Sequence, residues 1–450
     1  MSESWNLKPG NQTENTLLDV TELALEIAKS FGATMAEMSI GKGQGMSVTV
    51  RNGDVETVER NRDKSLAISV YFGHRNGTAT TTDFSRSAIE SSVRSACNIA
   101  KYTEEDEYNG LADVELLATE FPDLDLYHPW ELEMEEAIDM ALRCESAAFS
   151  SDSRVSNTEG ASISSHTGID LYANSHGFRG LSRSSRHSVG CSLIGGEGND
   201  MQRDYWYDSK RDAKDLLTVE SVGKEAANRT LRRLGARKIK TGKYPVIYEP
   251  SIASSLLGHL VSAISGSSLY RKASFLLDQK GEQIFPDNVR IHEQPHILKA
   301  SGSSAFDSEG IATSPRDIVN NGVLEDYVLS SYSARKLGLV STANAGGTHN
   351  LTIDSTDGGL DELIRSMGRG LVVSELIGFG VNTVTGDYSR GAFGFWVENG
   401  EIQYPVQEFT IAGNLTDMFR GFAAIGSDVD LRGSTRTGSI LIDNMTVAGE

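Results

Sequence analysis

Residues 46–77, MSVTVRNGDVETVERNRDKSLAISVYFGHRNG, contain the pattern that decides the fold. Apolar and polar residues alternate at 46–51 and again at 66–72, which is the period of a half-buried strand. Asn52-Gly53 and Asn76-Gly77 each offer the two positive-φ positions of a tight hairpin turn. The stretch therefore predicts an antiparallel meander with turns at 52–53 and 76–77.

Helical spacing of apolar residues flanks this meander at 17–31 and 89–100. The same order then returns, with a helix at 134–148, a β-rich stretch at about 153–208 and a weaker helix at about 219–234. This architecture, rather than sequence identity, predicts a duplicated helix–antiparallel meander–helix N-terminal region. Residues 103–130 between the two halves are acidic and aperiodic, and we expect an exposed connector there.

Beyond residue 240 the sequence predicts a β-rich C-terminal domain, with hairpins at Asn321-Gly322 and Asn399-Gly400. Short helices are expected at 252–265, 331–337, 360–367 and 415–422. Antiparallel meanders with segregated helices indicate an α+β fold. The expected units are 1–102, a connector at 103–130, 131–240 and 241–450, a division that suits a chain of 450 residues.

Charge and composition narrow the possible partners. The chain has 62 Asp and Glu against 42 Lys and Arg, a net charge of −20, and such a surface repels phosphate backbones. The basic run at 229–243 is therefore expected to be a solvated helix end and linker. No apolar run is long enough to span a membrane, and residues 1–10 show no secretory signal.

Three cysteines, Cys97, Cys144 and Cys191, lack C-x-x-C spacing. An odd number without that spacing argues against a disulfide framework and against a cysteine-rich zinc site. The helical apolar context of Cys97 and Cys144 predicts buried free thiols. The expected location is a reducing cytoplasm.

His292-Glu293-Gln294-Pro295-His296 matches the H-E-x-x-H pattern of zinc peptidases. That chemistry needs a helix, which brings the two imidazoles to one metal. Pro295 disfavours a helix at Gln294 and removes an amide, so we expect extended chain without metal. His259 lies on a predicted helix with no second ligand one turn away, so we expect a core histidine with a hydrogen-bonded ring.

Two further patterns are weak. Ser333 and Lys336 fit the S-x-x-K spacing of serine acylases, but the companion motifs are missing. Asp307 and Glu309 would share a face in a strand and could orient a substrate, but in a turn they are solvated, which is the favoured interpretation. Residue chemistry alone thus yields a soluble multi-domain α+β protein without a convincing catalytic set.

Several longer stretches resemble the PmbA/TldE branch of the TldD/PmbA family, once called modulators of DNA gyrase. The matching stretches are 174–177 (NSHG), 267–275 (SSLYRKASF), 305–310 (AFDSEG), 331–339 (SYSARKLGL), 386–391 (GDYSRG) and 395–400 (FWVENG). The resemblance implies a subunit of a cytoplasmic zinc-dependent peptidase. In that family the TldD-type subunit carries an H-E-x-x-x-H helix and a later Cys that bind the metal, and its PmbA/TldE-type partner lacks that site.

Matching this motif through Arg271-Lys272 places the metal-site positions on Gly258, His259, Ala263 and Thr437. Gly and Ala offer no lone pair, and a neutral Thr hydroxyl is a poor zinc ligand. We therefore expect no catalytic residue and no cofactor in this chain, with zinc held by the partner subunit. The remaining matched residues are candidate substrate or partner contacts: Arg271, Lys272, Asp307, Glu309, Asp387 and Arg390.

The function expected from this resemblance is that of a non-catalytic subunit that binds a TldD-type protease and a peptide or unfolded protein, in proteolysis and peptide maturation. A homodimer is a further possibility. The alternative is a stand-alone homo-oligomeric module that binds peptides without protease activity. A third interpretation, a metal-independent hydrolase, would use Ser333 and Lys336.

Overall fold

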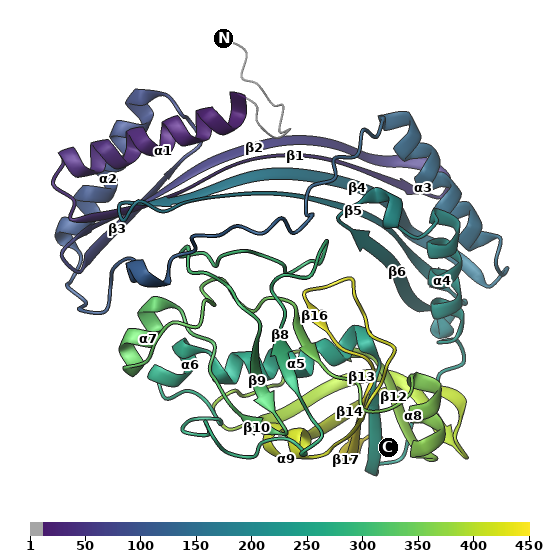
Figure 1. The fold of residues 1–450 in the computed structure, drawn as a ribbon. Helices are drawn as coiled ribbons and strands as arrows, with labels where there is room; N and C mark the ends of the chain where they lie inside the picture. The colour runs from purple at the N-terminus through teal and green to yellow at the C-terminus, as the bar shows by residue number, and fades with distance from the viewer. Residues whose placement is uncertain (1–11) are drawn as a thin grey trace.

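A computed structural model describes residues 12–450 (Figure 1). The expectation about a signal at residues 1–10 lies outside the described residues. No helix of the described chain combines the length and the apolar character needed to cross a membrane. The mixed α+β class and the β-rich C-terminal region are confirmed.

The N-terminal half forms one arched, antiparallel six-stranded sheet (Figure 1). In sheet order its strands are β3 (Arg75–Thr81), β2 (Asp54–Phe72), β1 (Met35–Arg51), β4 (Val155–Asn174), β5 (Arg179–Gly195) and β6 (Gln202–Lys210). The central pair β1–β4 runs from Glu37 opposite Asn174 to Val50 opposite Ala161. The strands of both predicted halves therefore belong to a single sheet.

The hairpin predicted at Asn52-Gly53 is confirmed, with φ of 54° and 82°. The turn predicted at Asn76-Gly77 is wrong, because the chain already turns after Phe72 and Gly77 lies within β3, opposite Val70. A Cβ atom at Gly77 would overlap backbone atoms of Ala96 and Ala100 in helix α2 (Arg86–Tyr102). Gly77 therefore serves close helix packing rather than a turn.

Four helices pack on this sheet, two near each end (Figure 1). They are α1 (Gln12–Ser30) and α2 at one end and α3 (Met134–Phe149) and α4 (Val219–Leu231) at the other. Each pair buries its own apolar cluster. Cys97 and Cys144 are buried free thiols as predicted, and Cys191 is buried as well. The order helix, three-stranded meander, helix therefore occurs twice along the chain.

The segment 103–130 was expected to be an exposed connector, and this holds only in part, since Glu104, Glu105 and Glu107 are exposed but other residues are not. Apart from the short helix η1 (Val114–Leu116) it lacks regular structure, yet Leu111, Ala112 and Leu124 are buried. Its backbone pairs with the C-terminal half, because the amide of Ala118 donates to Gly310 O at 2.9 Å. Apolar residues that show no helix or strand periodicity can still be buried against loops. The acidic composition of the segment therefore did not indicate that some of its residues are buried.

The C-terminal half holds two sheets around one core (Figure 1). One contains β10 (Val323–Leu324), β9 (Arg316–Asn320), β8 (Ile291–Glu293), β11 (Leu351–Ile353) and β16 (Thr435–Arg436). The other contains β14 (Glu401–Asn414), β13 (Asp387–Glu398), β12 (Gly370–Ile377), β7 (Gly242–Tyr248), β17 (Ile440–Ala448) and β15 (Phe422–Ile425).

The short elements predicted in this half are confirmed. The helices are α5 (Pro250–Ile264), α6 (Gly266–Tyr270), α7 (Ser331–Leu337), α8 (Leu360–Met367) and α9 (Leu415–Arg420), of which α6 was not predicted. Hairpin turns lie at Asn321-Gly322 and Asn399-Gly400, all four residues with positive φ.

Candidate functional site

Helix α5 carries the positions at which the family motif would place its metal ligands. It begins with a proline, whose fixed φ suits the first helical turn and whose missing amide needs no partner there. One face is buried in the C-terminal core, with Leu256, Leu260 and Ala263 all fully buried. The opposite face has only small residues that are exposed or half-buried: Ser251, Ser254, Ser255, Gly258 and Ser262.

The residues on α5 differ in their access to solvent. Gly258 is exposed, and a side chain there would enter open space within the described chain. Ala263 is fully buried. His259 is half-buried beside the ring of Tyr388 at 5.9 Å, and its Nε2 has no hydrogen-bond partner among the described residues. The expected hydrogen-bonded ring is therefore wrong. Desolvation and then the charge of Arg390 lower the pKa of His259, so a neutral imidazole is favoured.

Thr437, matched to the late Cys of the family, is also unsuited to a metal. It is fully buried, and its hydroxyl donates to Gly438 O at 2.8 Å. In the described part of the chain, no three His, Cys, Asp or Glu side chains lie close enough together to hold a metal ion. Gly258, His259, Ala263 and Thr437 thus do not fit zinc, because one imidazole is the only good donor among them.

The H-E-x-x-H stretch is extended only in its first part: His292 and Glu293 lie in strand β8 (Ile291–Glu293), whereas Pro295 and His296 lie in a turn. His292 Nε2 lies 2.9 Å from Asp354, and His296 Nε2 lies 3.1 Å from the Thr313 hydroxyl. Glu293 is buried and accepts from Arg316 Nε at 2.7 Å. Its side chain links strands and loops rather than serving a metal.

Ser333 and Lys336 have structural partners of their own. The Ser333 hydroxyl accepts from the Ser330 amide at 3.0 Å and completes the N-terminal cap of α7. Lys336 Nζ lies 3.4 Å from Asp106. Desolvation lowers the pKa of Lys336, but hydrogen bonds to Tyr332 and Asp106 outweigh it and raise that pKa above its usual value. A lysine base would need the opposite shift, so the geometry disfavours the metal-independent hydrolase.

Asp307 and Glu309 are not solvated as expected. Asp307 is buried and accepts from the amides of Glu309 and Ile311 at 2.9 and 3.0 Å. Burial, together with the nearby charge of Glu309, raises the pKa of Asp307 to about 6. Glu309 accepts from the Ser331 amide at 2.9 Å, at the start of α7. Both carboxylates therefore hold loops in place.

The remaining candidate contacts do not gather at one place. Arg271 and Lys272 are exposed in the turn after α6, where Lys272 has a φ of 56°. Asp387 is exposed at the start of β13 and accepts from the Thr385 hydroxyl at 2.7 Å. Arg390, further along β13, is half-buried and lines a cavity that sequence reasoning did not find.

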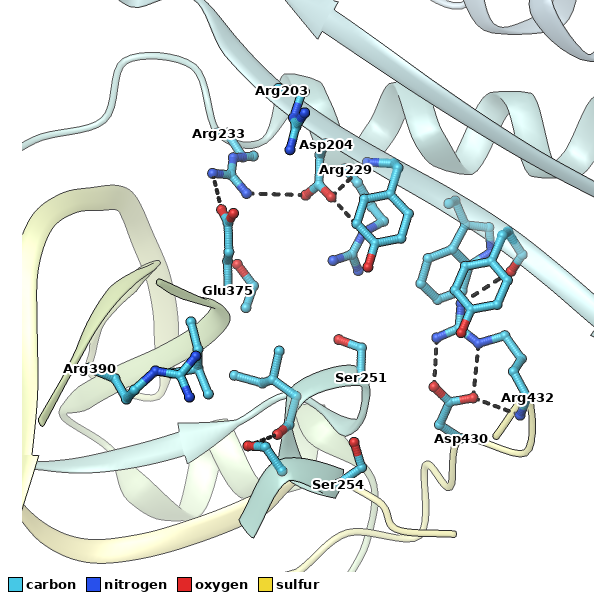
Figure 2. A pocket seen from close by; sticks show the side chains of 17 residues that line it. Arg203, Asp204, Arg229, Arg233, Ser251, Ser254, Glu375, Arg390, Asp430 and Arg432 are labelled. Atoms are coloured by element: carbon cyan, nitrogen blue, oxygen red, sulfur yellow. Dashed lines mark hydrogen bonds and ion pairs between the residues drawn. The ribbon is translucent and has the colours of Figure 1, made fainter. Parts of the chain in front are cut away.

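This cavity of about 390 Å³ lies between the two halves of the chain (Figure 2). On one side strand β6 contributes Asp204, helix α4 contributes Arg229, and the turn after α4 contributes Arg233, as Figure 2 shows. Helix α5 contributes Ser251 and Ser254 on the other. The cavity therefore reaches the first part of the small-residue face of α5, and Ser255, the last residue of α5 that lines it, precedes His259 by about one turn.

The walls of the cavity are positively charged although the whole chain is acidic. Five arginines and three carboxylates line it, a formal excess of two positive charges. Arg229 and Arg233 belong to the basic run that was expected to be solvated, and this is wrong for both: their side chains are only 11% and 9% exposed. Arg233 donates to Glu375 at 2.6 Å (Figure 2). The only signal in the sequence was the presence of these arginines near the end of a predicted helix.

Known proteins match this chain over nearly its whole length. Three family descriptions match: PmbA/TldA metallopeptidase domain 1 at residues 36–100, the central domain at 127–234 and the C-terminal domain at 241–449. The chain belongs to the TldD/PmbA family. Metalloprotease PmbA of Escherichia coli O157:H7 is 50% identical over 96% of each chain, and a Metalloprotease PmbA homolog of Haemophilus influenzae is 47% identical over 97% of each.

Solved structures of TldD/PmbA proteins share this fold. A protein from Bacteroides thetaiotaomicron, described as a modulator of DNA gyrase, has a TM-score of 0.92 at 31% identity and covers 96% of this chain and 99% of its own. TldE from Thermococcus kodakarensis has a TM-score of 0.84 at 19% identity, covering 96% and 100%, which is evidence of fold alone.

Proposed function

We propose that this chain is the non-catalytic subunit of a TldD/TldE-type zinc-dependent peptidase. The observation that carries the proposal is that Gly258, Ala263 and Thr437, which match the positions of the family's metal ligands, include no good zinc ligand, while His259 matches the position of its Glu. A TldD-type partner supplies the zinc, and this chain supplies the matching scaffold. Its relatives bear the name metalloprotease, and in our proposal that activity belongs to the assembled complex.

The surroundings of the site support a role in handling peptides. The small-residue face of α5 leaves room beside Gly258 for an extended chain. Three buried free cysteines suit a reducing compartment, so we place the complex in the cytoplasm. The repeated order of helix, meander and helix supports an origin of the arched sheet by internal duplication.

The test is zinc analysis and a peptidase assay on the chain alone and after mixing with a TldD-type subunit. We expect substoichiometric zinc and no cleavage alone, and metal-dependent cleavage from a stable mixed complex. Tight stoichiometric zinc in the isolated chain would contradict the proposal. A chain that forms homo-oligomers, binds peptides and ignores the TldD-type subunit would instead be the stand-alone binding module.

A further inference from the structure

We propose that the cavity between β6, α4 and α5 binds a peptide through the carboxylate at its C-terminal end. The proposal rests on the cavity of this chain and does not depend on the proposed partnership. It assigns a ligand class to a place where no metal ligand and no catalytic residue has been identified.

Two arginines that line this cavity have few hydrogen bonds within the described chain. Among the described residues Arg390 has no ion-pair partner, and its only recorded hydrogen bond is a long one from Nε to Ile377 O at 3.4 Å. Arg229 meets Asp204 and Glu249 only at 3.5 Å, and its buried Nε has no hydrogen-bond partner in the described chain. Buried guanidinium groups with free N–H donors are costly unless an acceptor arrives.

A second, independent observation comes from Ser374 on β12. Ser374 is one of the residues that line the cavity, only 5% of its surface is exposed, and its buried hydroxyl has no partner among the described residues. Native structures rarely leave such a group unsatisfied. A ligand carboxylate in the cavity would supply the acceptor that Ser374 lacks once its hydroxyl turns toward the cavity.

The cavity suits the end of a peptide in size and shape. Its volume of about 390 Å³ lies in the range of small-ligand sites. Residues 203–207, five in a row on the outermost strand of the sheet, line one wall, so a strand edge without a neighbouring strand borders the cavity. Side chains already bond part of this edge, since the Tyr205 amide donates to Asp204 at 2.8 Å and Arg432 donates to Tyr207 O at 3.1 Å. An extended peptide can pair with such an edge. Trp206 supplies an apolar surface, held in place by Arg432 at 4.0 Å.

The charge balance favours one carboxylate over a phosphate. Part of the positive charge of the cavity is neutralised by the carboxylates Glu375, Asp204 and Asp430. Arg233 donates to Glu375 at 2.6 Å, and Arg432 donates to Asp430 at 2.7 Å. Arg229 already lies between Asp204 and Glu249, each at 3.5 Å. Arg390, which has no ion-pair partner among the described residues, matches a single carboxylate, whose two oxygens fit the planar guanidinium fork.

The experiment measures binding by calorimetry on the full chain, with an N-acetylated tripeptide that ends in a free carboxylate. The matched ligand is the same tripeptide with a C-terminal amide, and inorganic phosphate is the third probe. Arg390→Gln removes a charged donor, Ser254→Phe fills the cavity from α5 without changing charge, and Arg420→Gln alters an exposed arginine of α9 as a control. Thermal melting verifies that each variant folds.

We expect the acid to bind at least about tenfold more tightly than the amide, because a hydrogen bond to a charged group contributes that much. Arg390→Gln should weaken binding of the acid by a similar factor, Ser254→Phe should also weaken it, and Arg420→Gln should leave it unchanged. Equal binding of acid and amide, no binding of the acid up to about 1 mM, or phosphate binding as tightly as the acid would each overturn the proposal. None of these outcomes bears on whether the chain pairs with a TldD-type subunit.

Discussion

Replacing Glu293 separates a structural role from a metal-binding role for the H-E-x-x-H stretch. The carboxylate is 2% exposed and accepts from Arg316 Nε, Asn344 Nδ2 and the His349 amide at 2.7, 2.9 and 2.7 Å. Removing one partner of a buried ion pair costs about 3–5 kcal/mol. Arg316 keeps its ion pair with Asp326, so the cost here comes from leaving the donors of Arg316, Asn344 and His349 without their buried acceptor. We therefore expect Glu293→Ala to lower the free energy of unfolding by about 3–5 kcal/mol.

The loss should appear as a lower melting temperature. At about 2–4 °C per kcal/mol for a unit of 150–250 residues, the expected decrease is about 6–20 °C. Glu293→Gln should cost less, since the amide still accepts from His349 and Arg316 keeps Asp326 at 3.0 Å. The control is Glu325→Ala, an exposed carboxylate in the same half, which should change stability by at most about 0.5 kcal/mol.

Circular dichroism melting and elemental metal analysis are run on the same preparations. The structural interpretation requires an unchanged metal content together with a lower melting temperature. A Glu293→Ala variant that melts like the unmodified chain but has lost bound zinc would refute it.

Three further predictions concern individual side chains. Gly77→Ala should destabilise the chain by about 1–3 kcal/mol, because the added methyl overlaps the backbone of α2. Gly258→Ala should stabilise the chain by about 0.5–1 kcal/mol, because this helical position is open. Denaturant unfolding of the two variants measures both changes. Because burial raises the pKa of Asp307 to about 6, the folded chain binds that proton more tightly than the unfolded chain. Stability should therefore fall by at most about 3 kcal/mol as pH rises from about 4 to about 6, and Asp307→Asn should remove this dependence in melts across pH. Ser333→Ala should cost about 1 kcal/mol as a lost helix cap and leave any peptidase activity of the mixed complex intact; an abolished activity would revive the serine hydrolase.

Local sequence patterns predicted the structure correctly where residues close together in the sequence determine it. The Asn52-Gly53 hairpin and helix α7 follow from turn chemistry and from the spacing of apolar residues. Gly77 shows the limit of this reasoning, since its Asn-Gly pair looks like a turn but its glycine is needed for contact with a helix that comes later in the chain. Tertiary packing overrode the local preference there.

The burial of charged residues could not be predicted in the same way. Arg229 and Arg233 looked like solvated residues because their carboxylate partners are distant in sequence or on another element: Asp204 on β6, Glu249 before α5 and Glu375 on β12. The fold must be known before such residues can be brought together. The cavity had no sequence signature for the same reason, since four or more separate segments form its walls.

The contrast between the acidic chain and its arginine-lined cavity restricts the anions that can enter. A net charge of −20 repels a polyanion along its whole length, whereas the cavity arginines act only within about one Debye length, roughly 8 Å at physiological salt. A peptide with one terminal carboxylate presents its single negative charge inside that distance and little charge outside it. Added salt would then screen the long-range repulsion and the local attraction together, so binding of such a peptide should depend only weakly on ionic strength. A steep loss of affinity with salt, of the kind seen for nucleic acids, would mean that the ligand contacts a positive surface far larger than this cavity.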